Sequence, residues 1–189
     1  MTRSEEQIIL ERIRQGEESL YERFIDLYSA RLFSVIIGVV RNREDAQEIV
    51  QDVFTKAFFS LDKFRGDSSF STWLFRIAYN MSVSKIRRKR SSFNVERVED
   101  FVTEQYFDET ENHLGKEQRY SMAELLLNQL TLDERFIILS FYARQKSIKE
   151  IAQIIGKSEN NTKVKLFRIR QRLCYEANKI DQLKLESNV

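Results

Sequence analysis

Apolar residues recur three or four positions apart along most of the chain, which is the spacing of a helix face. In residues 9–40 the pattern breaks at Gln15-Gly16, so it predicts one helix before that pair and further helices after it. Residues 45–58 continue the pattern, with six apolar residues on one face. The first half of the chain is therefore expected to form a helical domain.

The second half of the chain continues the helical pattern and adds a characteristic turn. Apolar residues in 125–140 predict two helices joined near Leu132-Asp133. Residues 147–156 predict a short helix in which Ala152 permits close helix crossing and Gly156 ends the helix with a positive φ. A long basic helix is expected to follow. Two helices joined by such a turn are typical of the helix-turn-helix fold.

The composition supports helices and argues against catalysis. The 189 residues include no proline and only five glycines, so little interrupts a helix or supplies the tight turns of many short strands. One cysteine, Cys174, and one histidine, His113, exclude a disulfide scaffold, a Cys-based metal site and a Cys-His or Ser-His pair. We therefore expect no cofactor, no metal and no enzyme. Because no apolar run approaches about 18 residues, we also expect no membrane insertion and a cytoplasmic location.

The net charge of +2 conceals three segments of strong and opposite charge. Residues 81–90 carry +5 and residues 141–173 carry +7, whereas residues 91–118 carry −6. The acidic segment has no sustained helical period, and we interpret it as a flexible linker between two small helical domains, 1–90 and 119–189. It is either a loose surface loop or an acidic segment that lies in a cationic channel. Its acids include Glu96, Glu99, Asp100, Glu104, Asp108, Glu109 and Glu111.

A turn-rich loop followed by a helix carries the first candidate nucleic-acid site. Residues 64–70 form the loop, and Ser71 or Thr72 is expected to cap a helix that begins near Trp73. That helix runs directly into the basic residues 85–90. A positive track beside aromatic side chains is typical of proteins that hold single-stranded nucleic acid. The alternatives are a core role for Trp73 and a solvated helix end for the basic run.

The helix after Gly156 carries the second candidate site. Thr162, Leu166 and Ile169 are expected to face inward, and Thr162 then needs a hydrogen-bond partner. Asn can pair with an adenine edge, Lys and Arg can pair with guanine, and an apolar side chain can contact a thymine methyl group. A solvated basic face is the alternative. The predicted DNA-binding face comprises Asn160, Asn161, Lys163, Val164, Lys165, Phe167 and Arg168.

Four motifs in collinear order resemble those of the extracytoplasmic-function (ECF) group of bacterial RNA polymerase sigma factors, within the sigma-70 family. They lie at 12–16, 45–54, 64–80 and 148–172, and the resemblance covers almost the whole chain. It implies an all-α fold of two helical domains, sigma region 2 and sigma region 4, joined by a linker. It also implies a transcription initiation factor whose partners are core RNA polymerase and promoter DNA. The family admits an anti-sigma factor as a further partner.

The resemblance assigns roles to positions that match the family's motifs. Glu48, Gln51 and Asp52 would dock on the clamp of the largest polymerase subunit, and the C-terminal domain would rest on the polymerase flap. The helix-turn-helix face would bind the promoter −35 element. A second set would capture a flipped base of the −10 element and hold the opened strand. This −10 set is Phe64, Arg65, Gly66, Asp67, Ser68, Ser69, Phe70, Trp73, Arg76, Asn80, Lys85, Arg87 and Arg88.

Two positions depart from the family's pattern. Thr162 stands where a valine is usual, and Val164 stands where a small polar residue is common, which leaves the base preference at that point open.

Two other classes of protein account for part of the sequence. A stand-alone helix-turn-helix regulator explains the C-terminal half but not residues 64–80, and such regulators are usually dimers on two half-sites. A purely helical adaptor would leave both basic segments as solvated surface. It would bind DNA weakly and with little dependence on salt.

Overall fold

A computed structural model describes residues 2–92 and 122–186, and the regular elements in these ranges are all helical, as the sequence predicts. The first range contains α1 (Arg3–Arg14), the 3₁₀ helix η1 (Glu18–Tyr21), α2 (Glu22–Val40), α3 (Arg43–Phe59), the 3₁₀ helix η2 (Leu61–Lys63) and α4 (Phe70–Ser92). In the second range, residues 122–128 are helical and precede α6 (Leu132–Tyr142), α7 (Ile148–Ile155) and α8 (Glu159–Glu186). The acidic residues of the expected linker lie outside the described residues.

Side-chain caps and backbone turns set the helix ends. Asn42 caps α3, because its Oδ1 accepts a hydrogen bond from the Asp45 amide at 2.7 Å. Ser147 and Glu150 form a reciprocal capping box at the start of α7. Gly156 ends α7 with a φ of 67°, which is the left-handed conformation predicted from the sequence.

Helix α4 begins one turn earlier than its sequence pattern predicts. The Thr72 amide donates to Ser69 Oγ at 3.1 Å, and the Trp73 amide donates to the Ser69 carbonyl oxygen at 3.1 Å. Ser69 is therefore the cap, and the prediction of a cap at Ser71 or Thr72 is wrong. All three residues are good caps by type, and the burial of Phe70, which is 1% exposed, decides where the helix starts.

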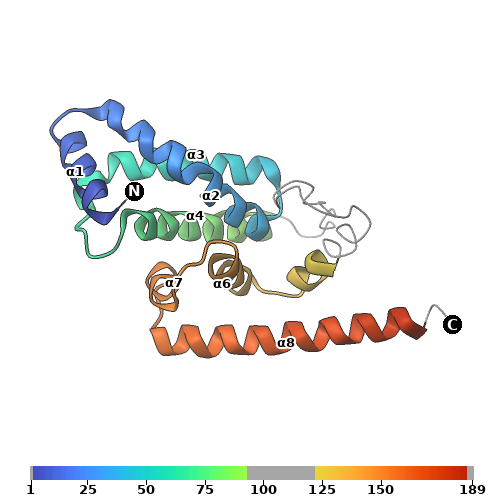
Figure 1. Ribbon diagram of the computed structural model, residues 1–189. Coiled ribbons are helices and arrows are strands. Elements are labelled where there is room, and N and C mark those ends of the chain that lie inside the picture. The colour runs from blue at the N-terminus through green and yellow to red at the C-terminus, as the bar shows by residue number, and fades with distance from the viewer. Residues whose placement is uncertain (1, 93–121, 187–189) are drawn as a thin grey trace, which may run out of the picture.

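Helices α1 to α4 pack around an aromatic core. Helix α2 contacts α3 and α4, and α3 contacts α4 (Figure 1). Phe24 of α2 and Phe70 of α4 are fully buried, with ring centroids 4.5 Å apart. Tyr21 of η1 meets Phe54 of α3 edge to face, and its hydroxyl donates to the Phe54 carbonyl oxygen at 2.8 Å. Burial of each such ring stabilises the fold by about 1.5–3 kcal/mol.

Helices α6, α7 and α8 form the helix-turn-helix unit. Helix α8 contacts both α6 and α7 and extends well beyond them as a long rod (Figure 1). Ile151 and Ile154 of α7 are buried, as are Leu166 and Ile169 of α8. The inward face of α8 is thus the one that the sequence predicts.

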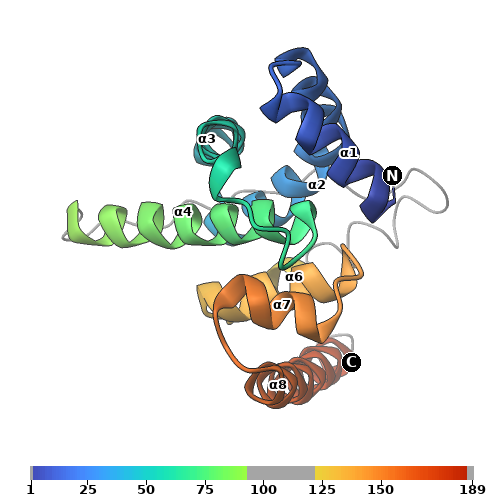
Figure 2. The same ribbon diagram turned by 90° about the vertical axis from the view of Figure 1, so that its left-hand side faces the viewer.

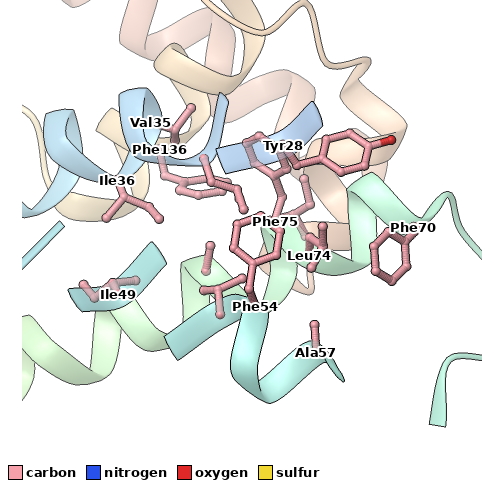
Figure 3. Close-up of a cluster of buried hydrophobic side chains, with 14 of the residues drawn as sticks. Tyr28, Val35, Ile36, Ile49, Phe54, Ala57, Phe70, Leu74, Phe75 and Phe136 are labelled. Atoms are coloured by element: carbon pink, nitrogen blue, oxygen red, sulfur yellow. The ribbon is translucent and has the colours of Figure 1, made fainter. Parts of the chain in front are cut away.

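The two halves of the chain pack directly on each other. Helix α6 lies against α2, and α7 lies against α4 (Figure 2). Phe136 of α6 enters the cluster that contains Val35 and Ile36 of α2 (Figure 3). The buried apolar residues of both halves form one continuous cluster. The sequence pattern predicts two helical domains but does not predict this contact between them.

Removal of the capping hydroxyl tests the start of α4. We expect Ser69→Ala to lower the free energy of unfolding by about 1 kcal/mol, because the Thr72 amide loses its partner. Ser68→Ala is the matched control, since the Ser68 hydroxyl bonds to the neighbouring Ser69 carbonyl oxygen rather than to an amide of α4. Urea unfolding followed by circular dichroism measures both variants. Equal losses would contradict the assigned cap.

Candidate nucleic-acid interface

The loop between η2 and α4 rests on three aromatic rings. Phe64, Phe70 and Trp73 have ring centroids 5.2–5.6 Å apart. Trp73 is half-buried among them, so it belongs partly to this cluster and partly to the surface. Arg14 Nη2 of α1 donates to the carbonyl oxygens of Leu61 and Phe64 at 3.1 and 2.8 Å. Side chains from α1 and α4 therefore support the start and the underside of the loop.

Part of the predicted −10 set in this loop is accessible to solvent. The exposed or half-buried members are Arg65, Gly66, Asp67, Ser68 and Ser69. Phe64 and Phe70 differ from the expectation, because they are 8% and 1% exposed and support the loop from the core. Gly66 has a φ of 80°, a conformation that a residue with a side chain adopts only under strain.

Helix α4 presents a polar strip beside the loop. Arg76, Asn80 and Arg87 are exposed and follow Trp73 at intervals that keep them on one side of the helix. Together with loop residues 65–69 they form a single surface, which we call the α4 surface. It brings together guanidinium, amide and aromatic groups suited to phosphates and unstacked bases.

Two lysines near the end of α4 are paired with acids of α3. Lys85 Nζ lies 2.6 Å from Glu48 Oε2 and 3.4 Å from Asp45 Oδ1, and Lys89 also pairs with Asp45. The hydrogen bond to Glu48 is the main cause that raises the pKa of Lys85. The +5 segment therefore offers less unpaired charge to a phosphate than its sequence suggests. Its exposed, described side chains are Arg87, Arg88 and Lys89.

The predicted polymerase-docking residues lie on the exposed side of α3. Glu48, Gln51 and Asp52 are exposed, and Phe59 on the same side is 81% exposed. Gln51 and Phe59 also line an open groove of about 1080 Å³ between α2, η1 and α3. Sequence reasoning misses this groove, because its walls come from separate elements. Its apolar lining includes Ile25, Phe33, Val50, Phe54 and Phe58.

Helix α8 exposes the predicted −35 face. Ser158 Oγ accepts a hydrogen bond from the Asn161 amide at 3.2 Å, next to the start of the helix. Thr162 is buried, and its Oγ1 donates to the Ser158 carbonyl oxygen at 3.0 Å, which supplies the required partner. Val164 and Phe167 are 41% and 58% exposed. The other members are exposed or half-buried: Asn160, Asn161, Lys163, Lys165 and Arg168.

Two ion pairs hold α8 against α6. Lys165 Nζ lies 3.3 Å from Asp133 Oδ2, and Arg172 Nη2 lies 2.8 Å from Glu134 Oε2. Burial alone would raise the pKa of Glu134, but hydrogen bonds from the Thr131 amide and from Arg172 hold it below its usual range. Acids of α6 therefore neutralise two of the positive charges on α8, those of Lys165 and Arg172.

Two exposed helix faces rich in basic and amide groups, one of them on a helix-turn-helix, define a DNA-binding protein of the helix-turn-helix class. Among the residues that the structure describes, no group of three or more His, Cys, Asp or Glu side chains is placed to hold a metal ion. No helix within 2–92 or 122–186 combines the length and the apolar character needed to cross a bilayer.

Comparison with known families matches both halves of the chain. Residues 24–92 match the family described as Sigma-70 region 2, and residues 121–173 match Sigma-70, region 4. The chain belongs to the sigma-70 family of RNA polymerase sigma factors, in the ECF group.

Curated relatives and solved structures agree with this assignment. The chain is 29% identical to the ECF RNA polymerase sigma-E factor of Escherichia coli (strain K12), over 88% of this chain and 91% of the relative. It is 25% identical to the RNA polymerase sigma-H factor of Pseudomonas aeruginosa, over 90% and 93%. The sigma factor RpoE of Bartonella quintana, solved with the anti-sigma factor NepR, matches with a TM-score of 0.69, 25% identity and coverage of 85% and 98%.

Neutralising Glu48 tests the pairing of the lysines. We expect Glu48→Gln to increase affinity for single-stranded DNA and to steepen its salt dependence by less than one ion, because Lys85 then keeps only its longer contact with Asp45 and is more available to a phosphate. Glu44→Gln is the matched control, since it removes the same charge from an exposed site in the first turn of α3. Fluorescence anisotropy across a salt series measures both variants. Identical slopes for the two would show that Lys85 is already available.

Proposed function

We propose that this protein binds core RNA polymerase, directs it to specific promoters through their −35 and −10 elements, and opens the DNA for transcription initiation. The proposal is supported above all by the presence, on one chain, of two separate surfaces suited to nucleic acid. One is the α4 surface, and the other is the predicted −35 face of α8, which we call the α8 face. A stand-alone regulator needs only the second of these surfaces.

The α8 face is suited to the major groove of duplex DNA. Its asparagines and its lysine and arginine side chains provide donors for base edges, and Val164 and Phe167 provide apolar contacts for a thymine methyl group. The capped start of α8 and the ion pairs to α6 fix the direction of the helix. We assign the −35 element to this face.

The α4 surface is suited to an opened strand. Arg65, Arg76 and Arg87 are exposed to meet phosphates, and Asn80 offers both a donor and an acceptor to a base edge. Capture of a flipped base in the loop offsets the unstacking cost of about a few kcal/mol. Melting then needs no nucleotide hydrolysis, so we propose a non-enzymatic role in the cytoplasm, where the polymerase works.

Core polymerase would dock on the exposed side of α3. Glu48, Gln51 and Asp52 provide polar contacts there, and the groove beside Phe59 provides apolar area. Each DNA surface alone is small for a specific contact. A polymerase that holds both domains raises the effective concentration of the second surface once the first is bound.

An anti-sigma factor is a further proposed partner. It is suggested by the similarity to RpoE of Bartonella quintana, which was solved in complex with the anti-sigma factor NepR.

Run-off transcription on a randomised promoter library tests the proposal as a whole. With core polymerase present, we expect the full chain to enrich templates that carry two conserved elements at a fixed spacing. Transcription without promoter selectivity would contradict the proposal. Binding to duplex DNA as a dimer without polymerase would favour the stand-alone regulator.

Asn80 tests the α4 surface. We expect Asn80→Ala to lose most open-complex formation and to keep its affinity for core polymerase, because the side chain is exposed on the DNA side of α4. Permanganate reactivity of the promoter measures melting, and anisotropy measures binding to the polymerase. Asn160→Ala, which removes the same group from the α8 face, is the control that should melt a promoter once it is bound. Normal melting by Asn80→Ala would remove Asn80 from the site.

Arg168 tests the α8 face. We expect Arg168→Ala in the holoenzyme to weaken binding to a −35 duplex by about 1–3 kcal/mol and to relax sequence selectivity there. Arg170→Ala is the control, since Arg170 is also exposed but lies two positions along and points to a different side of α8. Equal losses in the two variants would indicate a nonspecific charge effect.

A further inference from the structure

Helix α1 lies outside the part of the chain that matches region 2, because that match begins at residue 24. It nevertheless contacts η2, directly before the loop to which we assign base capture. Figures 1 and 2 both place α1 at the end of the N-terminal half where this loop lies. Ile9, Leu10 and Ile13 are buried in the core and hold the helix there. Helix α1 therefore forms a packed support on one side of the loop.

Arg14, in the last turn of α1, bonds to the backbone at the start of the loop. Its Nη2 donates to the carbonyl oxygens of Leu61 at 3.1 Å and Phe64 at 2.8 Å, so both hydrogens of that nitrogen are engaged. Its Nη1 lies 3.6 Å from Glu11 Oε2 on the same helix. A planar guanidinium held on both sides presents its donors in a fixed direction.

The bond to Phe64 fixes the backbone at the point where the loop leaves η2. A peptide unit is planar, so holding the Phe64 carbonyl group sets the plane of the peptide that joins Phe64 to Arg65. The Leu61 carbonyl oxygen also accepts a bond from the Phe64 amide at 3.1 Å, which closes the turn of η2. Arg14 therefore ties this turn and the first peptide of the loop to α1.

The rest of the loop is held separately. At its far end, Ser69 caps α4 and Phe70 is buried. At its middle, a Cβ atom built on Gly66 would lie 4.0 Å from Gln7 Nε2 of α1. Gln7 and Arg14 are about two turns apart, so they lie on the same side of α1. One side of α1 thus follows the loop from its start to Gly66.

Arg12 has a different environment, although it is only two positions from Arg14. Its Nε donates to Glu17 Oε1 at 2.8 Å, and its side chain is 50% exposed, whereas the Arg14 side chain is 30% exposed. Arg12 thus bonds within its own part of the chain, and Arg14 bonds to the loop. The sequence alone does not distinguish these two arginines.

We propose that Arg14 is a positioning residue for base capture, which holds the start of the loop so that residues 65–69 keep the shape that receives a flipped base. The inference rests on the proposed function for its consequence, but the effect of Arg14 on the loop can be measured in the free chain. Arg14 then controls discrimination at the captured base rather than affinity for the strand. Phosphate contacts by the exposed Arg76 and Arg87 of α4 do not require a particular loop shape.

Arg14→Met is the test variant, because methionine is a good helix former, keeps an apolar stem and has no donor. Arg12→Met is the matched control, since it removes the same charge from the same helix and leaves the bonds to the loop in place. Arg14→Lys is the conservative variant. Its ammonium group keeps the charge but lacks the planar fork, so we expect it to restore the function only in part.

Trp73 reports on the loop in the free chain. It is the only tryptophan of the sequence, and its half-buried ring lies 5.2 Å from that of Phe64 between centroids. We expect acrylamide to quench its fluorescence more strongly in Arg14→Met, to an intermediate degree in Arg14→Lys, and no more strongly in Arg12→Met. Circular dichroism and urea unfolding check that each variant is folded under the conditions of the measurement.

Binding of −10 single strands to the holoenzyme measures base capture. A strand selected by the unaltered protein is compared with copies in which one abasic site is moved through the element. In the unaltered holoenzyme we expect one position at which the abasic site weakens binding by about tenfold, a usual value for one stacked base. In Arg14→Met we expect this ratio to fall below about threefold, with the affinity for the abasic strand unchanged.

The outcomes separate positioning from stability and from the proposed function. An unchanged abasic ratio in Arg14→Met overturns the inference, and so do equal effects in Arg14→Met and Arg12→Met. If Arg14→Met does not fold, values for Arg14→Lys that equal those of the unaltered chain overturn it. If quenching rises as expected but the unaltered holoenzyme has no position sensitive to an abasic site, the proposed base capture fails, whereas the support of the loop by Arg14 is confirmed.

Discussion

Helix α4 must divide its side chains among three different surroundings, and the rest of the structure depends on this division. Leu74 and Ala78 are buried in the core, Tyr79 bonds to the C-terminal half, and Arg76 and Asn80 face solvent. With about 3.6 residues per turn, two buried sides leave only a narrow strip for nucleic acid. The loop before α4 enlarges that strip, because the aromatic rings beneath it hold residues 65–69 at the surface.

On both candidate DNA surfaces, some of the positive side chains are already paired with carboxylates of the same chain, so the charge open to DNA is smaller than the formal charge. Lys85 and Lys89 are paired with acids of α3, and Lys165 is paired with Asp133 of α6. Such partly exposed pairs stabilise the fold little. Their larger effect is on binding, because a lysine that already has a carboxylate partner releases fewer counterions when DNA arrives. Arginines therefore carry more of the available positive charge on α4 than its sequence suggests.

Helical periodicity predicts the elements of both halves, and the residue types at the turn predict the helix-turn-helix, including the buried Thr162 with its local partner. These features depend on residues a few positions apart. The true cap at Ser69 depends on the burial of Phe70 against Phe24, which local pattern does not reveal. The approach of Gly38 to Leu139 joins helices a hundred positions apart and has no local signal at all. The groove beside Phe59 also has no local signal, because its walls come from α2, η1 and α3.

An apolar groove open to water affects how much of a protein can accumulate. The side of α3 that carries Phe59 remains solvated in the free chain, and exposed apolar patches of this kind promote self-association. The chain is therefore least soluble when it outnumbers whatever covers that groove. We therefore expect self-association through this groove when the chain is present in large excess over any partner that covers it.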